Sequence, residues 1–244
     1  MVIEEYISNS LSKLKLEASK NQLNRIYTYL DLLSEKNKSI NLTGTKNKEE
    51  ILVEHLFDSL SIFQYFHSRH IPPDKNLNII DVGTGGGLPG IPLAVFLTSS
   101  NIILLDSRIK ICIFLNQVVA ELKLKNAVIV NGRAELLSHE SGFRENFDLV
   151  VSRALGNVRQ VSEITVPFCK TGGRIILYKS KKVHEEINEA KEALNILSAE
   201  TEEIFETDVP DLNKYRVLLV IKKLKSTLYK YPRKYAKMLK KPLP

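Results

Sequence analysis

A glycine-rich loop after a short apolar run is the part of this sequence best suited to bind a small molecule. Residues 77–93 read LNIIDVGTGGGLPGIPL, so the apolar run 77–80 ends on Asp81 and the glycines follow at once. A strand, a glycine loop and a helix start form the edge of a nucleotide-binding crevice in α/β proteins. Glycines let the chain turn sharply and let a ligand approach its backbone. The loop by itself does not identify the nucleotide.

Two classes of nucleotide cofactor fit this loop, and charge distinguishes them. Residues 85–90, GGGLPG, satisfy the G-x-G-x-x-G pattern of dinucleotide-binding proteins. A pyrophosphate needs free N–H donors at a helix start and no nearby anion. Here Asp81 lies close by, and Pro89 and Pro92 remove two donors. S-adenosylmethionine has no phosphate but carries an ammonium and a sulfonium, both of which a carboxylate favours.

The spacing of the loop residues supports the same choice. The order Asp81-x-Gly83-x-Gly85-x-Gly87 is the one that S-adenosylmethionine-dependent methyltransferases use. We therefore expect S-adenosylmethionine as the cofactor, bound by these four residues.

The ends of the next three strand-like runs carry further candidate residues. Asp106 ends the second run, 19 residues beyond Gly87, where an acidic residue accepts hydrogen bonds from ribose hydroxyls in either cofactor class. After the third run, Ala134 and Glu135 are expected at the adenine. After the fourth, Arg153 lies in the segment Ser-Arg-Ala that faces the reacting methyl group.

The segment around Arg153 also excludes some methylation chemistries. Amino-group methyltransferases place an Asn/Asp-Pro-Pro-aromatic run there, and residues 152–155, SRAL, lack it. Cytosine carbon-5 enzymes need a nucleophilic cysteine, whereas Cys112 lies in a helical pattern and Cys169 follows Phe168, so both are expected to be buried thiols. A ring nitrogen with its own lone pair remains as acceptor. Its attack needs no general base, so alignment and proximity would supply most of the catalysis.

The pattern of apolar residues predicts the elements that position these residues. Residues 4–37 and 48–66 read as helices joined by a polar loop at 37–47. Short apolar runs at 77–81, 101–106, 126–131, 147–152 and 174–179 alternate with helical stretches, which indicates a parallel sheet covered on both faces. Runs at 200–206 and 215–222 are joined by a short turn, so they form an antiparallel hairpin. The expected fold is a Rossmann-like α/β sheet of seven strands, as in class I methyltransferases.

We expect three parts in the chain: a helical cap (1–70), a cofactor-binding core (71–223) and a basic C-terminal arm (224–244). The net charge is +7, and residues 222–244 hold nine of the 35 Lys and Arg with no Asp or Glu, which leaves 26 basic against 28 acidic side chains before them. Such an arm suits a polyanion, so phosphate contacts are expected from it, Arg233 and Lys234 included.

Composition also limits the setting. No apolar window of about 18 residues and no secretion signal is present, so we expect a cytoplasmic protein without a membrane partner. The two cysteines lack metal-ligand spacing, and we expect no metal site. We expect a monomer.

Several segments together resemble the GidB/RsmG family, bacterial methyltransferases of 16S ribosomal RNA. The similarity runs from about residue 37 to the C-terminus, and its most specific part is DVGTGGGLPGIPLA (81–94) followed by SRA (152–154). The resemblance implies methylation of guanine ring nitrogen 7, with the small ribosomal subunit or its RNA as partner. It also implies donor contacts from the following positions: Gly83, Leu88, Asp106, Ala134, Glu135 and Arg153.

By the same resemblance, Asn41, His55 and Asp58 match motifs of the helical cap and are candidate RNA contacts. Lys179, at the end of the fifth run, is a further candidate. Arg153, the expected catalytic residue, is able to hold either the methionine carboxylate or the target guanine, and the sequence does not separate these roles. Two alternatives also stay open: a small-molecule methyltransferase on the same fold, and a non-catalytic RNA-binding or ribosome assembly protein with a vestigial donor site. A nicotinamide oxidoreductase is disfavoured by Asp81.

Overall fold

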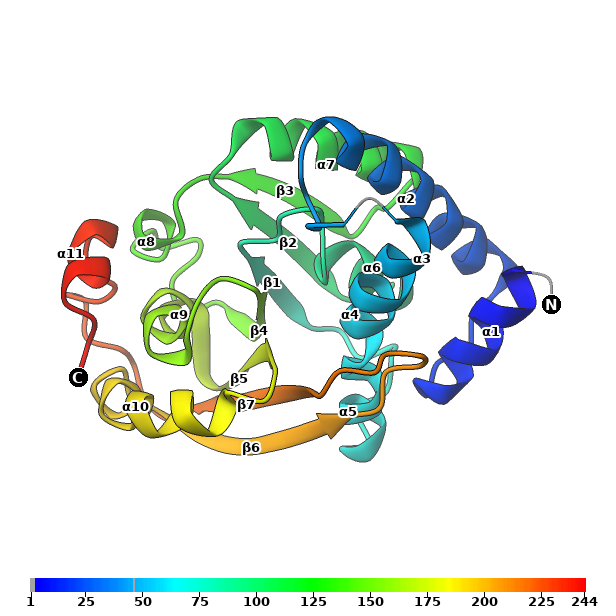
Figure 1. The fold of residues 1–244 in the computed structure, drawn as a ribbon. Coiled ribbons are helices and arrows are strands. Elements are labelled where there is room, and N and C mark those ends of the chain that lie inside the picture. Colours follow the sequence, from blue (N-terminus) through cyan, green and yellow to red (C-terminus); the bar gives the residue numbers. More distant parts are fainter. Residues whose placement is uncertain (1–2, 46) are drawn as a thin grey trace.

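The protein is described from a computed structural model, which places residues 3–45 and 47–244. Its centre is a seven-stranded sheet with the order β3-β2-β1-β4-β5-β7-β6 (Figure 1). Neighbouring strands among β1–β5 pair in parallel, while β7 runs antiparallel to both β5 and β6. This is the predicted arrangement of five parallel strands and a terminal hairpin. The strands are β1 (Asn78–Val82), β2 (Asn101–Asp106), β3 (Ala127–Asn131), β4 (Phe147–Arg153), β5 (Cys169–Lys179), β6 (Ala199–Thr207) and β7 (Arg216–Lys223).

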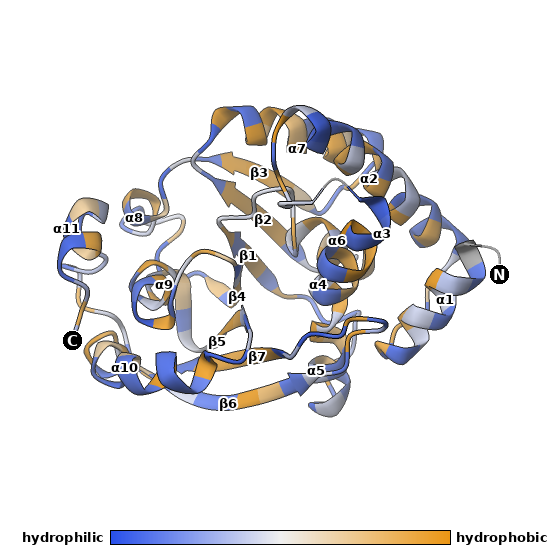
Figure 2. Ribbon diagram, in the orientation of Figure 1, coloured by the Kyte–Doolittle hydropathy of each residue, from blue (hydrophilic) through white to orange (hydrophobic). Residues whose placement is uncertain are grey.

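The sheet is buried on both faces, which explains why its central strands are continuously apolar. Successive side chains point to opposite faces of a strand, so Ile79 and Ile80 enter two different hydrophobic clusters. Leu104 and Leu105 divide in the same way. Figure 2 shows the apolar strands enclosed by helices of mixed polarity. The helices that follow β1 in the chain are α6 (Gly90–Phe96), α7 (Ile109–Glu121), α8 (Ala134–Leu137), α9 (Val158–Thr165), the 3-10 turn η2 (Val166–Phe168), α10 (Val183–Ile196) and α11 (Tyr235–Lys240).

The prediction of one helix over residues 4–37 is wrong, because the chain forms two helices there. They are α1 (Ile3–Lys13) and α2 (Lys20–Ser39). Lys15 has a positive φ of 64°, which ends α1, and the Ser19 side chain caps α2 in a reciprocal pair with Gln22. Buried apolar side chains continue through the break, so the apolar stripe gave no sign of it.

The second predicted helix is confirmed, although it is not uniform. It comprises α3 (Lys48–Glu50), the π-helical segment η1 (Ile51–Phe57), α4 (Asp58–Leu60) and α5 (Ile62–Ser68). The wide π-helical turn contains the candidate residue His55, and Asp58 follows it directly. Such turns are frequent at functional sites.

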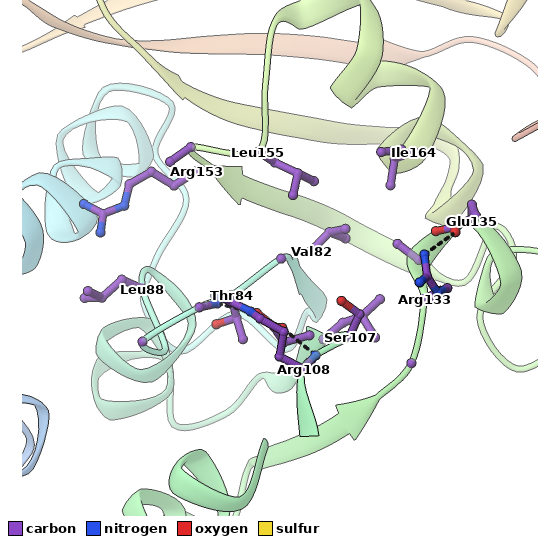
Figure 3. A pocket seen from close by; sticks show the side chains of 18 of the residues that line it. Val82, Thr84, Leu88, Ser107, Arg108, Arg133, Glu135, Arg153, Leu155 and Ile164 are labelled. Carbon is purple, nitrogen blue, oxygen red and sulfur yellow. Dashed lines mark hydrogen bonds and ion pairs between the residues drawn. The ribbon is translucent and has the colours of Figure 1, made fainter. Parts of the chain in front are cut away.

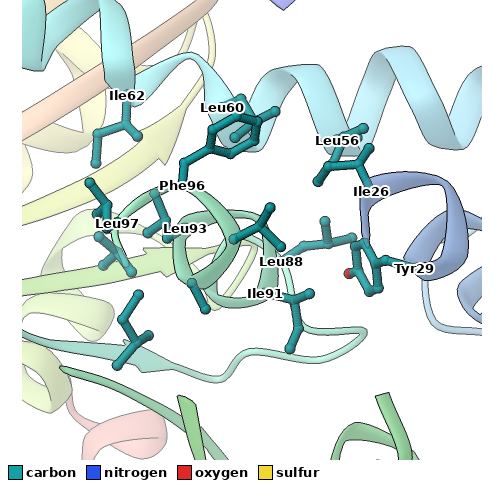
Figure 4. Packing of buried hydrophobic residues seen from close by; sticks show 14 of the residues in the cluster. Ile26, Tyr29, Leu56, Leu60, Ile62, Leu88, Ile91, Leu93, Phe96 and Leu97 are labelled. Carbon is teal, nitrogen blue, oxygen red and sulfur yellow. The ribbon is translucent and has the colours of Figure 1, made fainter. Parts of the chain in front are cut away.

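The first 70 residues and the sheet share one hydrophobic core. Ile26 and Tyr29 of α2 and Leu56 of η1 lie in the same cluster as Ile91 and Phe96 of α6 (Figure 4). The Tyr29 hydroxyl also donates a 2.9 Å hydrogen bond to the carbonyl of Gly86 in the glycine loop. The helical cap therefore packs directly on the layer that supports the cofactor loop.

The C-terminal arm lies folded against the protein. Tyr231, Met238 and Leu243 are buried in the second hydrophobic cluster. Figure 1 shows α11, the last helix of this tail, beside α8. Lys223, counted among the positive charges of this region, is fully buried and pairs with Glu145 at 3.1 Å. The arm is consequently a docked tail rather than a free extension.

One glycine of the loop is required by packing, which gives a first test. A Cβ added to Gly90 would lie 2.8 Å from the Leu104 side chain and 2.9 Å from the Asp81 carboxylate. We expect Gly90→Ala to lower the free energy of unfolding by about 2 kcal/mol through overpacking. For a chain of this size, the melting temperature then falls by about 4–8 °C, measured by calorimetry. Gly142→Ala is the control, because nothing lies within 4 Å of its added Cβ. Equal melting temperatures for the two variants would contradict the packing argument.

Candidate functional site

A cavity of about 410 Å³ opens at the carboxyl ends of the parallel strands (Figure 3). It lies where the strand order reverses between β1 and β4, which is the usual ligand site of an open α/β sheet. Six of the predicted cofactor residues and the predicted catalytic residue line it: Gly83, Gly85, Leu88, Asp106, Ala134, Glu135 and Arg153. Two others, Asp81 and Gly87, belong to the loop but do not line the cavity.

Asp81 lies beneath the loop and is fully buried. Its Oδ2 accepts hydrogen bonds from the Thr84 hydroxyl at 2.6 Å and from the Gly90 N–H at 2.8 Å. Its Oδ1 is buried and has no hydrogen-bond partner among the described residues. Burial raises the pKa of Asp81 to about 6, despite these two hydrogen bonds. Asp81 thus closes the loop into a ring and keeps one acceptor oxygen unused.

Most N–H groups of the loop are already hydrogen-bonded, either to the loop itself or to the end of β2. Those of Gly83 and Thr84 donate to the Leu105 carbonyl, and those of Gly87 and Leu88 donate to the Thr84 carbonyl. The N–H of Gly85 donates to the Asp106 carboxylate at 3.1 Å. A phosphate needs several free N–H donors, so this loop is poorly built for a dinucleotide. The prediction against a nicotinamide cofactor gains a structural reason.

Asp106 ends β2 and is paired with Arg108. The Arg108 Nε and one of its terminal nitrogens lie 3.1 Å from the two carboxylate oxygens, and its backbone N–H donates at 2.9 Å. Together with the bond from Gly85, these contacts use about four lone-pair positions, the full capacity of a carboxylate. A ribose hydroxyl can donate to Asp106 only after the half-exposed Arg108 guanidinium moves.

The far end of the cavity is formed by the start of α8 and by α9. Ala134 is the first residue of α8, and the Glu135 carboxylate lies 3.6 Å from the Arg133 guanidinium. Ile164 of α9 adds an apolar surface opposite them (Figure 3). This end offers an apolar slot with a carboxylate at its rim.

Arg153 lies on the boundary between this cavity and a second one of about 490 Å³. Its guanidinium points to the helical cap, where it donates to the Asp58 carboxylate at 3.1 Å and contacts Nδ1 of His55 at 3.0 Å. Figure 3 shows Leu155, two residues on, pointing the other way, and its side chain would clash at 2.7 Å with a Cβ on Gly83. The intervening Ala154 has a φ of 57°, a sparsely populated conformation for a residue with a side chain.

The second cavity brings together three of the predicted RNA-contacting residues: His55, Asp58 and Lys179. Burial, followed by the charge of Arg153, lowers the pKa of His55 to about 4, so its ring is neutral near pH 7. Because an arginine can only donate, His55 Nδ1 is the acceptor and its ring proton is on Nε2. Arg216 of β7 also lines this cavity, with its Nε 3.4 Å from Asp58.

Lys179 has a different role from the expected phosphate contact. Its ammonium is almost buried and lies 2.7 Å from both the Gly156 carbonyl and the Glu186 carboxylate. It ties the loop after β4 to α10, and a phosphate would have to displace Glu186. Asn41 lines neither cavity. Its side chain is exposed and accepts from the Gly44 N–H at 2.8 Å, which shapes the turn.

Arg233 is likewise not free to contact RNA. Its guanidinium makes two 2.7 Å bonds with the buried Glu163 carboxylate, and its backbone N–H makes a third at 2.9 Å. This residue anchors the tail. Lys234, its neighbour, is exposed and therefore stays a candidate for contact with RNA.

Sequence reasoning assigned no role to several residues that line the two cavities, among them Arg108, Leu155 and Arg216. Arg108 carried a usable signal, since it follows Asp106 by two residues. The others depend on how distant segments meet, and nothing in their local sequence marks them.

The residues present fit S-adenosylmethionine. The unpartnered Oδ1 of Asp81 supplies negative charge beneath the loop, Asp106 offers a carboxylate once Arg108 has moved, and the loop lacks a cradle of free donors for phosphate. The apolar slot at Ala134 and Ile164 suits a base. Both cysteines are buried as predicted, and burial raises the pKa of Cys169 to about 12.

Among residues 3–45 and 47–244, no three His, Cys, Asp or Glu side chains gather in a way that could hold a metal ion. In the same ranges, no helix has the length and apolar character to span a bilayer.

The strand order and the position of the cavity define the class: this is a Rossmann-like, class I methyltransferase fold. A solved S-adenosylmethionine-dependent methyltransferase from Aquifex aeolicus shares that fold, with a TM-score of 0.54 and 16% identity over 77% of this chain and 97% of that one.

Sequence comparison gives the family. The GidB family model, described as rRNA small subunit methyltransferase G, matches residues 22–213. The ribosomal RNA small subunit methyltransferase G of Lachnoclostridium phytofermentans is 41% identical over 96% of this chain and 94% of its own length. That of Clostridium novyi is 37% identical over 99% and 98%. The chain belongs to the GidB family, which confirms the predicted family and the methyltransferase class.

The ionisation of Asp81 makes donor binding depend on pH. The raised pKa of about 6 means that the carboxylate is charged at pH 7.5 and protonated at pH 5. If its charge favours a cationic donor, affinity for S-adenosylmethionine should fall by up to about tenfold as the pH falls through 6, measured by calorimetry.

Asp81→Asn is the matched variant, since it keeps the size and one acceptor oxygen. It should bind weakly at both pH values, with no such fall. A wild-type affinity that stays constant between pH 7.5 and pH 5 would show that the charge of Asp81 does not act on the donor.

Proposed function

We propose that this protein transfers a methyl group from S-adenosylmethionine to ring nitrogen 7 of a guanine in 16S ribosomal RNA of the small ribosomal subunit. The observation that carries the proposal is the junction of the two cavities, which share Leu42, Arg153 and Ala154. One cavity fits a cationic nucleoside, and the other is lined by groups that can bind a base. The family description names small-subunit ribosomal RNA as the substrate. The resemblance described above implies ring nitrogen 7 of guanine as the methylated atom.

The donor supplies an electrophilic methyl group on its sulfonium. The acceptor nitrogen uses its own lone pair, so no proton leaves in the step and no general base is required. This agrees with the side chains at the junction, where His55 is neutral and turned toward Arg153, and Asp58 is held by two guanidinium groups. The protein then contributes mainly position and orientation.

Arg153 is well suited to fix the acceptor. Asp58, His55 and the carbonyls of Glu54 and His55 hold its guanidinium from the side of the cap. Its remaining N–H groups, together with the guanidinium of Arg216, are donors at the second cavity. Guanine presents O6 and N7 as acceptors on one edge, and donors to O6 leave N7 free to react. We therefore favour the guanine role for Arg153 over contact with the methionine carboxylate.

The docked tail is the proposed RNA-binding surface. Its exposed cations include Lys225, Lys230, Lys234, Lys237, Lys240 and Lys241. They lie on a segment packed beside the donor cavity, so RNA held by them approaches the carboxyl edge of the sheet. We further propose that the protein acts as a cytoplasmic monomer, and that residues 1–70, 71–223 and 224–244 serve as cap, donor-binding core and RNA-binding tail.

The direct test uses labelled S-adenosylmethionine and small subunits or 16S RNA from cells that lack this enzyme. We expect label in RNA only, and mapping of the modified base should give a guanine methylated at N7. Label on another base, or donor binding without any transfer to RNA, would reject the proposal. A protein that binds no S-adenosylhomocysteine would instead be the non-catalytic assembly factor.

Arg153→Ala tests the roles of the two cavities separately, by comparing methyl transfer with donor binding. Because its guanidinium points to the second cavity, we expect transfer to fall at least about 100-fold while affinity for S-adenosylhomocysteine changes less than about threefold. Arg153→Lys keeps the charge but loses the fork of donors, so it should recover little activity. A large loss of donor affinity would place Arg153 on the methionine carboxylate.

The tail lysines provide a separate test of RNA binding. Changing Lys234, Lys237, Lys240 and Lys241 to Ala should weaken RNA binding and reduce the salt slope of log affinity by up to about 3, if each lysine neutralises one phosphate of single-stranded RNA. The measurement is a filter-binding series at several salt concentrations. The control changes four exposed lysines on other surfaces: Lys13, Lys20, Lys125 and Lys191. Equal slopes for the two quadruple variants would exclude the tail as the RNA surface.

A further inference from the structure

We propose that the C-terminal tail completes the donor pocket, with Tyr235 as the wall against which the adenine of S-adenosylmethionine packs. This rests on the proposed function, and it assigns to the tail a second role besides RNA binding. Tyr235 is the first residue of α11 and lines the same cavity as the glycine loop, although about 150 residues separate them in the chain. Among the described residues that line this cavity, it is the only aromatic one.

The position of Tyr235 within the cavity follows from the contacts of the tail. Arg233, two residues before it, forms the paired bonds with Glu163 described above, and Ile164, next to Glu163, lines the cavity. This ion pair therefore fixes Tyr235 near Ile164 and the start of α8. That is the apolar end of the cavity, away from the glycine loop, where the base was expected from Ala134 and Glu135.

Additional contacts hold the tail along the same edge. The Arg144 guanidinium donates to the carbonyls of Thr227 and Tyr231 at 2.7 and 3.0 Å, and the His139 ring contacts the Pro232 carbonyl at 3.0 Å. Before and after Tyr235, the buried side chains of Tyr231 and Met238 enter the hydrophobic cluster. The segment that carries Tyr235 is thus fixed at both ends, as a binding wall must be.

The exposure of Tyr235 agrees with a side chain that becomes covered when a ligand binds. Its side chain is 42% exposed, although Tyr231 and Met238 of the same tail are buried and Arg233 is paired with Glu163. Tyr229, in the same tail, is more exposed at 69%, but its ring already contacts Arg144 and His139 and does not line the cavity. An aromatic ring beside an apolar slot offers stacking to a base, a contribution that is favourable for every nucleobase.

The test is the affinity for S-adenosylhomocysteine, measured by calorimetry on the full-length protein. Tyr235→Ala should bind about tenfold more weakly, because it loses the stacking surface. Tyr235→Phe keeps that surface and should stay within about twofold of the wild type. Leu239→Ala is the matched control, since Leu239 is an exposed residue of the same helix that does not line the cavity.

A second ligand locates the effect on the base. 5′-Methylthioadenosine keeps the adenosine but lacks the amino-acid part, so Tyr235→Ala should weaken its binding by the same factor. A loss confined to S-adenosylhomocysteine would place Tyr235 near the amino acid instead and overturn the proposal. Should Tyr235→Ala unfold at the assay temperature, Tyr235→Leu takes its place, because it retains apolar volume without a ring and should still bind several-fold more weakly.

The outcomes also separate this inference from the proposed function. A wild-type protein that binds neither ligand contradicts the proposed function itself. A wild-type protein that binds both, together with a Tyr235→Ala variant of unchanged affinity, overturns only the role of Tyr235.

Discussion

The buried carboxylate of Asp81 is the interaction on which the donor site depends. Its two hydrogen bonds, to Thr84 and to the N–H of Gly90, join the two ends of the glycine loop and set where α6 begins. The close approach of Gly90 to Leu104 follows from that closure. A charged group held in a fully buried position is costly unless it is compensated, and the raised pKa expresses that cost. A bound cation would reduce it, so the same carboxylate both builds the loop and favours a positively charged ligand.

A second buried carboxylate, on the helical cap, organises the proposed acceptor side. Asp58 receives guanidinium groups from β4 and β7, and it thereby connects the cap to two strands of the sheet. The shared core beneath it, with Tyr29 bonded to the glycine loop, makes the cap and the sheet one packed body. The two cavities are therefore held in fixed relation where they meet, which is what a reaction that depends on alignment requires.

Local pattern was sufficient for the strands, the glycine loop and the terminal hairpin, because each is encoded by neighbouring residues. The break at Lys15 escaped prediction because buried side chains continue through it. Arg233 and Lys179 were expected at phosphates, but each pairs with a carboxylate on another element, Glu163 or Glu186. Seventy residues separate Arg233 from its partner, and a sequence without the fold gives no means of matching them. For the same reason the sequence predicted a free arm. The positive charges of the tail can be read from its own sequence, whereas the residues that hold it in place, such as Glu163, lie elsewhere in the chain.

If the donor ribose binds Asp106 as proposed, the pairing of Asp106 with Arg108 links the binding of the donor to the binding of RNA. A ribose that takes the carboxylate releases the guanidinium. The Arg108 side chain is 59% exposed and is solvated on release, while the ribose hydroxyls replace it at the Asp106 carboxylate, which is only 5% exposed. The freed cation stays at the mouth of the cavity, so the loaded protein presents one more positive charge to an approaching polyanion than the empty one. By thermodynamic reciprocity, a polyanion that draws Arg108 outward leaves Asp106 open to the ribose. The two ligands would then assist each other's binding through the Arg108 side chain.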